Sequence, residues 1–440
     1  MNPLAGIALV TAALGLLLLA VQWAARFPAV GGELRRKIVH VGMGLLTLTF
    51  PWLFQESWPV WLLAGAATGA LWLIRSQRHV RRLLGRALHD VPRTSWGELC
   101  FPWAVAMVFW LSRGDPVMFG IPVLMLTLAD AAGALAGGRY GRAGFKTPEG
   151  GNKSVEGSLA VFGVAFLCAH LPLLLMTNTG RAESVCAALT LALLVTLIES
   201  VAVRGLDNLI IPLGAFFLLQ IYREMEAGDL LLRFLITGGL LVMVVFMRRW
   251  HGLDAGATIG CALLGYGAVA LGGWLFLTPL LGFYVRHVAA LLLRPRLREY
   301  LHGIVAVLSI AASCLPWLGW FYLEGGPGLG PFVLAVCLHS ALNYHGGLLS
   351  GDGGAPWRKI MESTFMALAF SVLPLAGSVE PGLLVRVGAV SVLLVPAALV
   401  IGTRVLPRQA DGCYAVTETR FAVQSLIAFA GASALLIAGL

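Results

Sequence analysis

One carboxylate, Asp130, lies near the end of a predicted apolar helix that leads into a loop rich in glycines and cations, within residues 125–158. A carboxylate in an apolar membrane helix is costly and marks a functional site by default. The loop ends at residues 153–158 (KSVEGS), where another helix is predicted to begin. Glycines let the backbone approach a ligand, and a helix start presents unpaired N–H groups to an anion. These residues predict a site for a metal-bound polyphosphate at a membrane surface.

The glycines of this stretch have two interpretations. Gly133 and Gly137 have the small-xxx-small spacing that favours close packing of membrane helices. Packing does not account for Asp130 one turn earlier, nor for the further glycines of the loop, such as Gly141. Both roles, packing and ligand approach, therefore remain open from the sequence.

Three further polar clusters interrupt the apolar segments. His40 follows the cations Arg36 and Lys37, Glu199 ends a predicted helix, and Asp207-Asn208 comes shortly afterwards. In the topology predicted below, all of these clusters lie on the same side of the membrane as the Asp130 loop. We therefore expect them to converge on one site.

Composition identifies the elements that must position these residues. The 440 residues are 58% hydrophobic and only 12% charged, with a mean hydropathy of +0.84, whereas a soluble domain is about one quarter charged. Apolar runs of roughly 18–22 residues recur along the chain, and the alternation of a membrane β-barrel is absent. The prediction is an all-α polytopic integral membrane protein with about sixteen transmembrane helices in two helical bundles, residues 1–226 and 227–440.

The net charge of +9 is explained by topology. Most of the 31 lysines and arginines, including those of residues 75–93, fall in alternate loops, which the positive-inside rule makes cytoplasmic. We therefore expect a bacterial inner membrane protein with its site on the cytoplasmic face, both termini on the other face, and no nucleic-acid partner. Residues 4–24 are interpreted as a first membrane helix, not a signal peptide. The seven scattered cysteines argue against a disulfide framework and against thiolate metal sites.

A family resemblance rests on these same motifs. Residues 33–40, 130–133, 152–158 and 199–212 resemble the polyprenol kinase family, which includes dolichol kinase, phytol kinase and the CTP-dependent diacylglycerol kinase. The resemblance covers about residues 30–225, and residues 153–158 are its most specific part. It implies transfer of the γ-phosphate of a nucleotide, usually CTP, to a lipid alcohol with the help of a divalent metal ion.

The residue chemistry agrees with that implication, because phosphoryl transfer needs positioning and charge neutralisation. Carboxylates could hold Mg²⁺, lysines could contact the triphosphate, and a remaining carboxylate could accept the alcohol proton. The predicted metal ligands are Asp130, Glu156 and Glu199, and the predicted catalytic residues are Asp130, Lys153, Glu156, Glu199, Asp207 and His40. The predicted nucleotide-binding residues are Arg36, Lys37, Gly133, Gly137, Gly141, Lys146, Asn152, Lys153, Ser154, Gly157, Ser158 and Asn208.

The sequence leaves simpler roles open for three of these residues. His40 could be an interfacial histidine bonded to the backbone, and Lys153 a snorkelling topology lysine. Glu199 could be paired with Arg204. The division of metal and base roles among Glu156, Glu199 and Asp207 also remains open.

The second half carries weaker signals. Residues 252–285 are faintly similar to phytyl-phosphate-kinase-like membrane proteins. Residues 298–302 resemble residues 36–40, as expected of a degenerate internal repeat. Val392 stands opposite Asp130 in that repeat, so the copy lacks the metal carboxylate. The polar residues 338–345 are interpreted as a packed histidine and asparagine network. We expect this half to be a scaffold, a homodimer surface or a lipid-guiding module.

Three functions remain in competition. The favoured one is a kinase that phosphorylates an isoprenoid alcohol such as phytol, farnesol or a polyprenol, with Mg²⁺ and with CTP, or else ATP, as phosphate donor. A cytidylyltransferase acting on a lipid phosphate would also use metal and CTP, but would release pyrophosphate. A lipid transporter would place its polar site near the midplane between repeats, and a structure with Asp130 far from Lys153 and Glu199 would favour it.

Overall fold

The structure is a computed structural model. It describes residues 2–24, 31–76, 96–147, 152–247, 253–293, 302–349, 355–408 and 414–437. Most of the cationic loop predicted over residues 75–93, the loop glycines 150 and 151, and residues 298–301 of the proposed repeat lie outside these ranges. The chain divides into two compact units, residues 1–239 and 240–440. This division falls inside a helix, whereas the predicted domain boundary precedes that helix.

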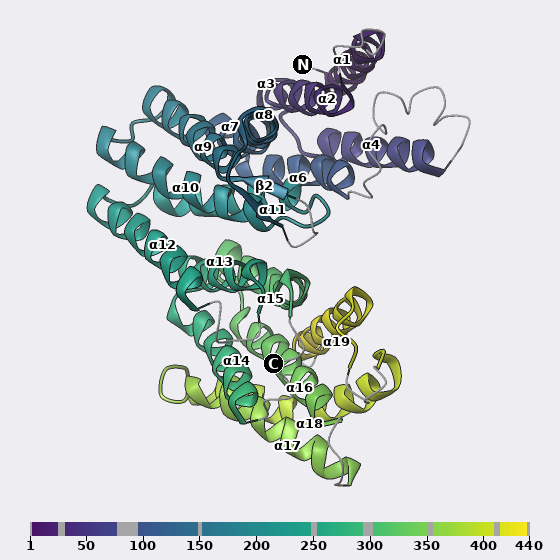
Figure 1. Cartoon of the computed structure of the whole chain (residues 1–440), viewed down its shortest axis with the longest axis vertical. Helices are drawn as coiled ribbons and strands as arrows, with labels where there is room; N and C mark the ends of the chain where they lie inside the picture. Colours follow the sequence, from purple (N-terminus) through teal and green to yellow (C-terminus); the bar gives the residue numbers. More distant parts are fainter. Residues whose placement is uncertain are drawn as a thin grey trace. The chain divides into compact units, whose positions relative to one another are not determined.

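The first unit is helical, with one small hairpin (Figure 1). Its elements are α1 (Pro3–Ala24), α2 (Gly32–Thr47), α3 (Phe50–Leu53), α4 (Trp58–Ser76), α6 (Gly97–Ser112), α7 (Pro116–Leu124), η1 (Met125–Ala129), α8 (Asp130–Tyr140), β1 (Gly144–Lys146), β2 (Asn152–Ser154), α9 (Val155–Met176), α10 (Arg181–Val201), α11 (Asp207–Tyr222) and α12 (Ala227–Met247), which continues into the second unit. Helix α9 packs on both α8 and α10, and α11 packs on α6, α7 and α10. The hairpin is antiparallel, with Phe145 opposite Lys153.

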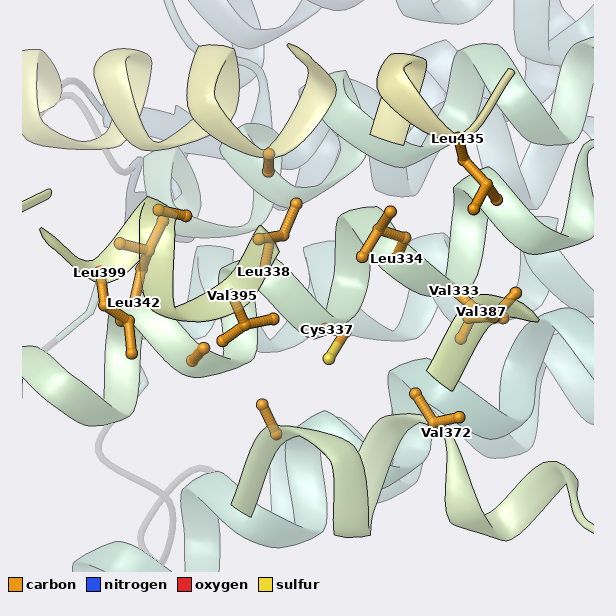
Figure 2. Close-up of a cluster of buried hydrophobic side chains, with 14 of the residues drawn as sticks. Val333, Leu334, Cys337, Leu338, Leu342, Val372, Val387, Val395, Leu399 and Leu435 are labelled. Atoms are coloured by element: carbon orange, nitrogen blue, oxygen red, sulfur yellow. The ribbon is translucent and has the colours of Figure 1, made fainter. Parts of the chain in front are cut away.

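The second unit is built around α16 (Leu329–Leu349). Its other elements are α13 (Ala255–Gly272), α14 (Trp274–Leu293), α15 (Ile304–Glu324), α17 (Pro356–Ser371), η3 (Leu373–Leu375), α18 (Pro381–Val405) and α19 (Glu418–Ile437). Helix α16 is buried on nearly every face and packs on α14, α15, α17, α18 and α19. Figure 2 shows Leu334 and Leu338 of α16 in an apolar core with Val395 and Leu399 of α18 and Leu435 of α19. Burial on nearly every face is typical of a helix at the centre of a bundle.

Helix length and composition agree with a membrane protein. Within the described ranges, ten helices are long and apolar enough to cross a bilayer, and three shorter apolar helices cover residues 58–73, 97–112 and 207–222. The all-α membrane class is thus supported. The predicted count of about sixteen spans is not confirmed.

Candidate active site

Three carboxylates from different helices meet in the first unit. Asp130 begins α8, Glu199 lies near the end of α10, and Asp207 is the first residue of α11. One oxygen atom from each lies within 4.8 Å of the others, and all three residues are half-buried. Like charges this close repel one another strongly unless cations neutralise them. The cluster therefore needs cations from the protein, a bound metal ion, or both.

A break in helical regularity places Asp130. Helix α7 contains Pro122, which has no N–H to donate, and the π-helical turn η1 follows directly. Single π-helical turns interrupt α-helices and frequently occur at functional sites. Thr127 of this turn lies against Gly44 of α2, where a Cβ atom would collide with the threonine side chain. The close approach of the two helices brings the cations of α2 to Asp130.

Lys37 and His40 of α2 both face Asp130. The Lys37 Nζ lies 2.6 Å from Asp130 Oδ2, and the lysine side chain is only 3% exposed. The His40 Nε2 lies 3.2 Å from the Leu126 carbonyl oxygen and 3.6 Å from Asp130 Oδ2. The carbonyl can only accept, so the histidine Nε2 donates this bond. His40 thus has the backbone partner that the simpler interpretation required, at a position next to the carboxylate.

Lys153 neutralises the second carboxylate. Its Nζ lies 2.8 Å from Glu199 Oε1 and also donates to the Glu199 backbone carbonyl. Glu199 is 14% exposed and Lys153 is 31% exposed. The cation that pairs with Glu199 is therefore Lys153, and not Arg204 as the alternative interpretation had it.

The remaining polar atoms fit a magnesium ion. Glu199 Oε2 and Asp207 Oδ1 are buried and have no hydrogen-bond partner. Among the described residues, no lysine or arginine forms an ion pair with Asp207. Mg²⁺ prefers oxygen ligands and is usually held by one or two carboxylates together with substrate phosphates and water. Buried carboxylate oxygens without partners beside two lysines provide such a ligand set.

The α8–α9 crossing depends on small residues. Ser154 caps α9, its Oγ accepting from the Gly157 N–H at 3.1 Å. A Cβ atom at Gly157 would lie 2.9 Å from the Gly133 carbonyl oxygen and 3.2 Å from Gly137 Cα, and Gly141 lies against Ser154. The structure thus gives these glycines a packing role, which holds Lys153 beside the carboxylates.

We expect Gly157→Ala to lower the melting temperature, because its methyl group would meet backbone atoms at the α8–α9 crossing. Overpacking of this kind costs about 1–3 kcal/mol. Thermal unfolding of the purified protein in detergent measures the effect. Gly163→Ala is the matched control on the same helix, because a Cβ atom there has no neighbour within 4 Å. Equal melting temperatures for the two variants would contradict the packing role.

The other predicted site residues lie on α2, on the hairpin and in the first turns of α9 and α11. Glu156 does not join the carboxylate cluster, and its Oε1 accepts from the Ala143 N–H at 3.3 Å. Ser158 lies in the first turns of α9 and Asn208 in the first turn of α11, both half-buried, while Arg36 is exposed on α2. Lys146 and Asn152 lie opposite each other in the hairpin.

The structure brings Asp207, and not Glu156, together with Asp130 and Glu199. The sequence offered Glu156, Glu199 or Asp207 for a second metal ion or for the alcohol proton, and the predicted metal ligands were Asp130, Glu156 and Glu199. The predicted and observed carboxylate groups differ because helical periodicity does not reveal the geometry of the loop after α10. A short turn, with positive φ angles at Arg204 and Gly205, returns the chain so that α11 starts beside the end of α10.

Comparison with known proteins gives one informative similarity. The chain is 29% identical over 221 residues to the phytol kinase of Synechocystis sp., which covers 49% of this chain and 92% of that kinase. No protein-family profile and no solved structure matches the chain. The similarity supports a phytol-kinase-like family, and a lipid-alcohol kinase in general terms, for about half of the chain.

Proposed function

We propose that the first unit transfers the γ-phosphate of a nucleoside triphosphate, CTP in preference to ATP, to the hydroxyl of an isoprenoid alcohol such as phytol, farnesol or a polyprenol. The observation that carries the proposal is the meeting of Asp130, Glu199 and Asp207 within 4.8 Å, with Lys37 and Lys153 paired to two of them. The similarity to a phytol kinase supports the choice of acceptor. The site faces the cytoplasm in this proposal, where it meets a soluble nucleotide and a membrane-dissolved alcohol.

The reaction forms one bond and breaks one. The alcohol oxygen attacks the γ-phosphorus, the bond from that phosphorus to the β,γ-bridging oxygen breaks, and the nucleoside diphosphate leaves with the bridging oxygen. Lys153 and Lys37 balance the charge of the phosphate oxygens as point charges. Asp130 and Glu199 would hold Mg²⁺, which when bound neutralises the charge on the transferred group. Lys153 exchanges part of its contact with Glu199 for the nucleotide.

Asp207 accepts the proton of the alcohol in this mechanism. It differs from the other two carboxylates because no described lysine or arginine pairs with it, and its buried Oδ1 has no hydrogen-bond partner. A general base must lie within hydrogen-bond reach of the proton that it takes. An alcohol oxygen placed at Asp207 would stand beside the group held by Asp130 and Glu199, since the three carboxylates lie within 4.8 Å.

The direct test is phosphate transfer by the purified full chain in detergent. The protein receives γ-labelled CTP or ATP with Mg²⁺, and phytol, farnesol, undecaprenol, dolichol or diacylglycerol as acceptor. Labelled lipid together with nucleoside diphosphate supports the kinase and identifies both substrates. Pyrophosphate release with a lipid phosphate as acceptor would instead indicate a cytidylyltransferase. A folded protein that binds no nucleotide and labels no lipid would contradict both enzymes.

We expect Asp207→Asn to reduce the transfer rate about 10²-fold, because the amide cannot accept the alcohol proton. Binding of the nucleotide, measured by isothermal titration calorimetry, should stay within a few-fold of wild type. Asp229→Asn is the matched control, because Asp229 lies in the first turn of α12 as Asp207 lies in the first turn of α11, but is exposed and outside the carboxylate cluster. Weaker nucleotide binding by Asp207→Asn, with turnover unchanged at saturation, would assign Asp207 to binding and not to proton transfer.

A further inference from the structure

The second unit contains two buried arginines within its apolar helix bundle. Arg286 of α14 is 2% exposed and Arg420 of α19 is 3% exposed. A buried charge is costly unless it is paired or bound to a ligand. The groups around the two arginines therefore indicate whether the protein itself or a bound ligand compensates their charges.

Arg286 faces aromatic rings. Its Cζ lies 5.1 Å from the ring centre of Phe283 and 5.3 Å from that of Tyr344. Its Nε and Nη2 atoms are buried without a hydrogen-bond partner, and no described carboxylate forms an ion pair with it. Cation–π contacts stabilise the guanidinium, but they leave its planar set of donors available in a buried position.

Imidazoles complete the same interior. The ring centre of His302 lies 5.6 Å from the ring centre of His287 and 6.2 Å from that of Phe421. The Arg420 Cζ lies 4.7 Å from the same Phe421 ring centre. Burial, and then the Arg420 and Arg286 charges, lower the pKa of His302 to about 4. His302 is therefore neutral at pH 7, with a buried Nδ1 that has no hydrogen-bond partner. Both guanidinium charges act on this one ring, so the two arginines share one electrostatic environment.

His339 extends the cluster along α16. Its Nδ1 lies 3.1 Å from the Gln424 Nε2, and its Nε2 is buried without a partner. His345, six positions on, instead contacts Ser363 Oγ at 3.1 Å. The two histidines are packed inside the unit but contact different partners, and among the described residues Asn343 forms no hydrogen bond with either. The predicted network of histidine and asparagine is therefore not confirmed. Only His339 belongs with the arginine cluster.

The neighbouring carboxylates are engaged elsewhere. Asp254, whose N–H donates to the His302 carbonyl, caps α13 through an Oδ1 that accepts from the Ala257 N–H at 2.6 Å. Glu362 accepts from the Tyr344 hydroxyl at 2.7 Å. These contacts leave the charge of Arg286 without a carboxylate from the described part of the chain.

We propose that Arg286, Arg420, His302 and His339 form a buried anion site that takes a phosphomonoester head group. A guanidinium matches the planar face of phosphate oxygens with two parallel hydrogen bonds, and neutral imidazoles add donors without further charge. Arg286 lies toward the end of α14, His302 just before α15 and Arg420 in the first turn of α19. His339 lies in the middle of α16, so the site reaches from these helix ends into the interior of the bundle. The proposal is independent of kinase activity in the first unit.

The test measures ligand-induced stabilisation of the full chain in detergent. Thermal unfolding is followed with inorganic phosphate, inorganic diphosphate or farnesyl monophosphate as probe, in EDTA so that divalent ions do not support binding in the first unit. Stabilisation by farnesyl monophosphate alone identifies a lipid phosphate as the ligand, and stabilisation by all three identifies the phosphate group itself. We expect Arg286→Met to lower the affinity for the probe that stabilises the wild-type protein at least tenfold. The matched control Arg386→Gln, which removes an exposed arginine of α18, should not change it.

The variants also separate this site from a structural role of Arg286. The ligand-free Arg286→Met protein should melt no lower than wild type, because the change removes a buried charge without a carboxylate partner. Lys153→Met, which alters the first unit, should retain the response to the probe. If Arg286→Met does not fold, Arg286→Lys should bind with an affinity between wild type and background. The proposal would be overturned if no probe raised the melting temperature of the wild-type protein, or if the probe stabilised an Arg286 variant as much as it stabilises the wild type.

Discussion

Replacing Asp130 by Asn is expected to reduce phosphate transfer about 10³-fold, the scale on which one preorganised electrostatic group affects a rate. The amide removes the charge that would hold Mg²⁺ and leaves Lys37, which is 3% exposed, without the carboxylate charge 2.6 Å from its Nζ. Both effects act in the same direction, because the uncompensated lysine also repels a metal ion. The rate should therefore fall at every Mg²⁺ concentration, and the half-saturating Mg²⁺ concentration should rise.

Asp115→Asn is the matched control for this change. Asp115 pairs with Arg223 at 3.0 Å and caps α7, but its side chain is 37% exposed and it lies outside the carboxylate cluster. Asparagine caps helices as well as aspartate does, so this variant should retain nearly full activity. Transfer assays across a Mg²⁺ titration compare the two. Full activity of Asp130→Asn would exclude Asp130 from the reaction.

The convergence of the polar clusters could be predicted from the sequence. Asp130, Lys153 and Glu199 are charged residues within or beside apolar segments, where a charge is retained only with a partner or a function. The positive-inside rule, applied to the alternate cationic loops, predicted that all of them lie on one side of the membrane. The structure joins Lys153 to Glu199 and places Asp130 beside them, as the kinase interpretation required and the transporter interpretation did not.

The choice of partners could not be predicted in the same way. Lys37 was assigned to the nucleotide, and in the structure its partner is Asp130, because the π-helical turn and the contact of Gly44 with Thr127 set how α2 faces α8. Neither the π-helical turn nor this contact can be recognised from the spacing of apolar residues in the sequence. Arg286, by contrast, is an arginine inside an apolar run of the sequence, and such a residue is itself a functional candidate.

Replacing Lys153 by Met is expected to reduce transfer about 10³-fold, the lower end of what a cation contributes to the charged transition state of phosphoryl transfer. The same change should destabilise the protein, because it removes the positive charge 2.8 Å from Glu199, which is 14% exposed. Breaking a fully buried pair costs about 3–5 kcal/mol, and the partial exposure of Lys153 reduces our expectation to about 2 kcal/mol. Thermal unfolding and transfer assays on the same preparation measure both effects.

The double variant Lys153→Met/Glu199→Gln separates catalysis from stability. Neutralising Glu199 removes the unpaired charge, so the melting temperature should return toward that of the wild type, while transfer stays at the level of Lys153→Met or below. Because Glu199 is itself a proposed Mg²⁺ ligand, the double variant is compared with Glu199→Gln alone. Lower transfer by the double variant than by Glu199→Gln would show that the cation acts on the phosphates and does more than balance a carboxylate. Recovery of both would mean that Lys153 only stabilises the fold. In that case Lys37 would be the remaining lysine of this cluster that could contact the nucleotide. The proposed contact of Lys153 with the phosphate oxygens would then be wrong.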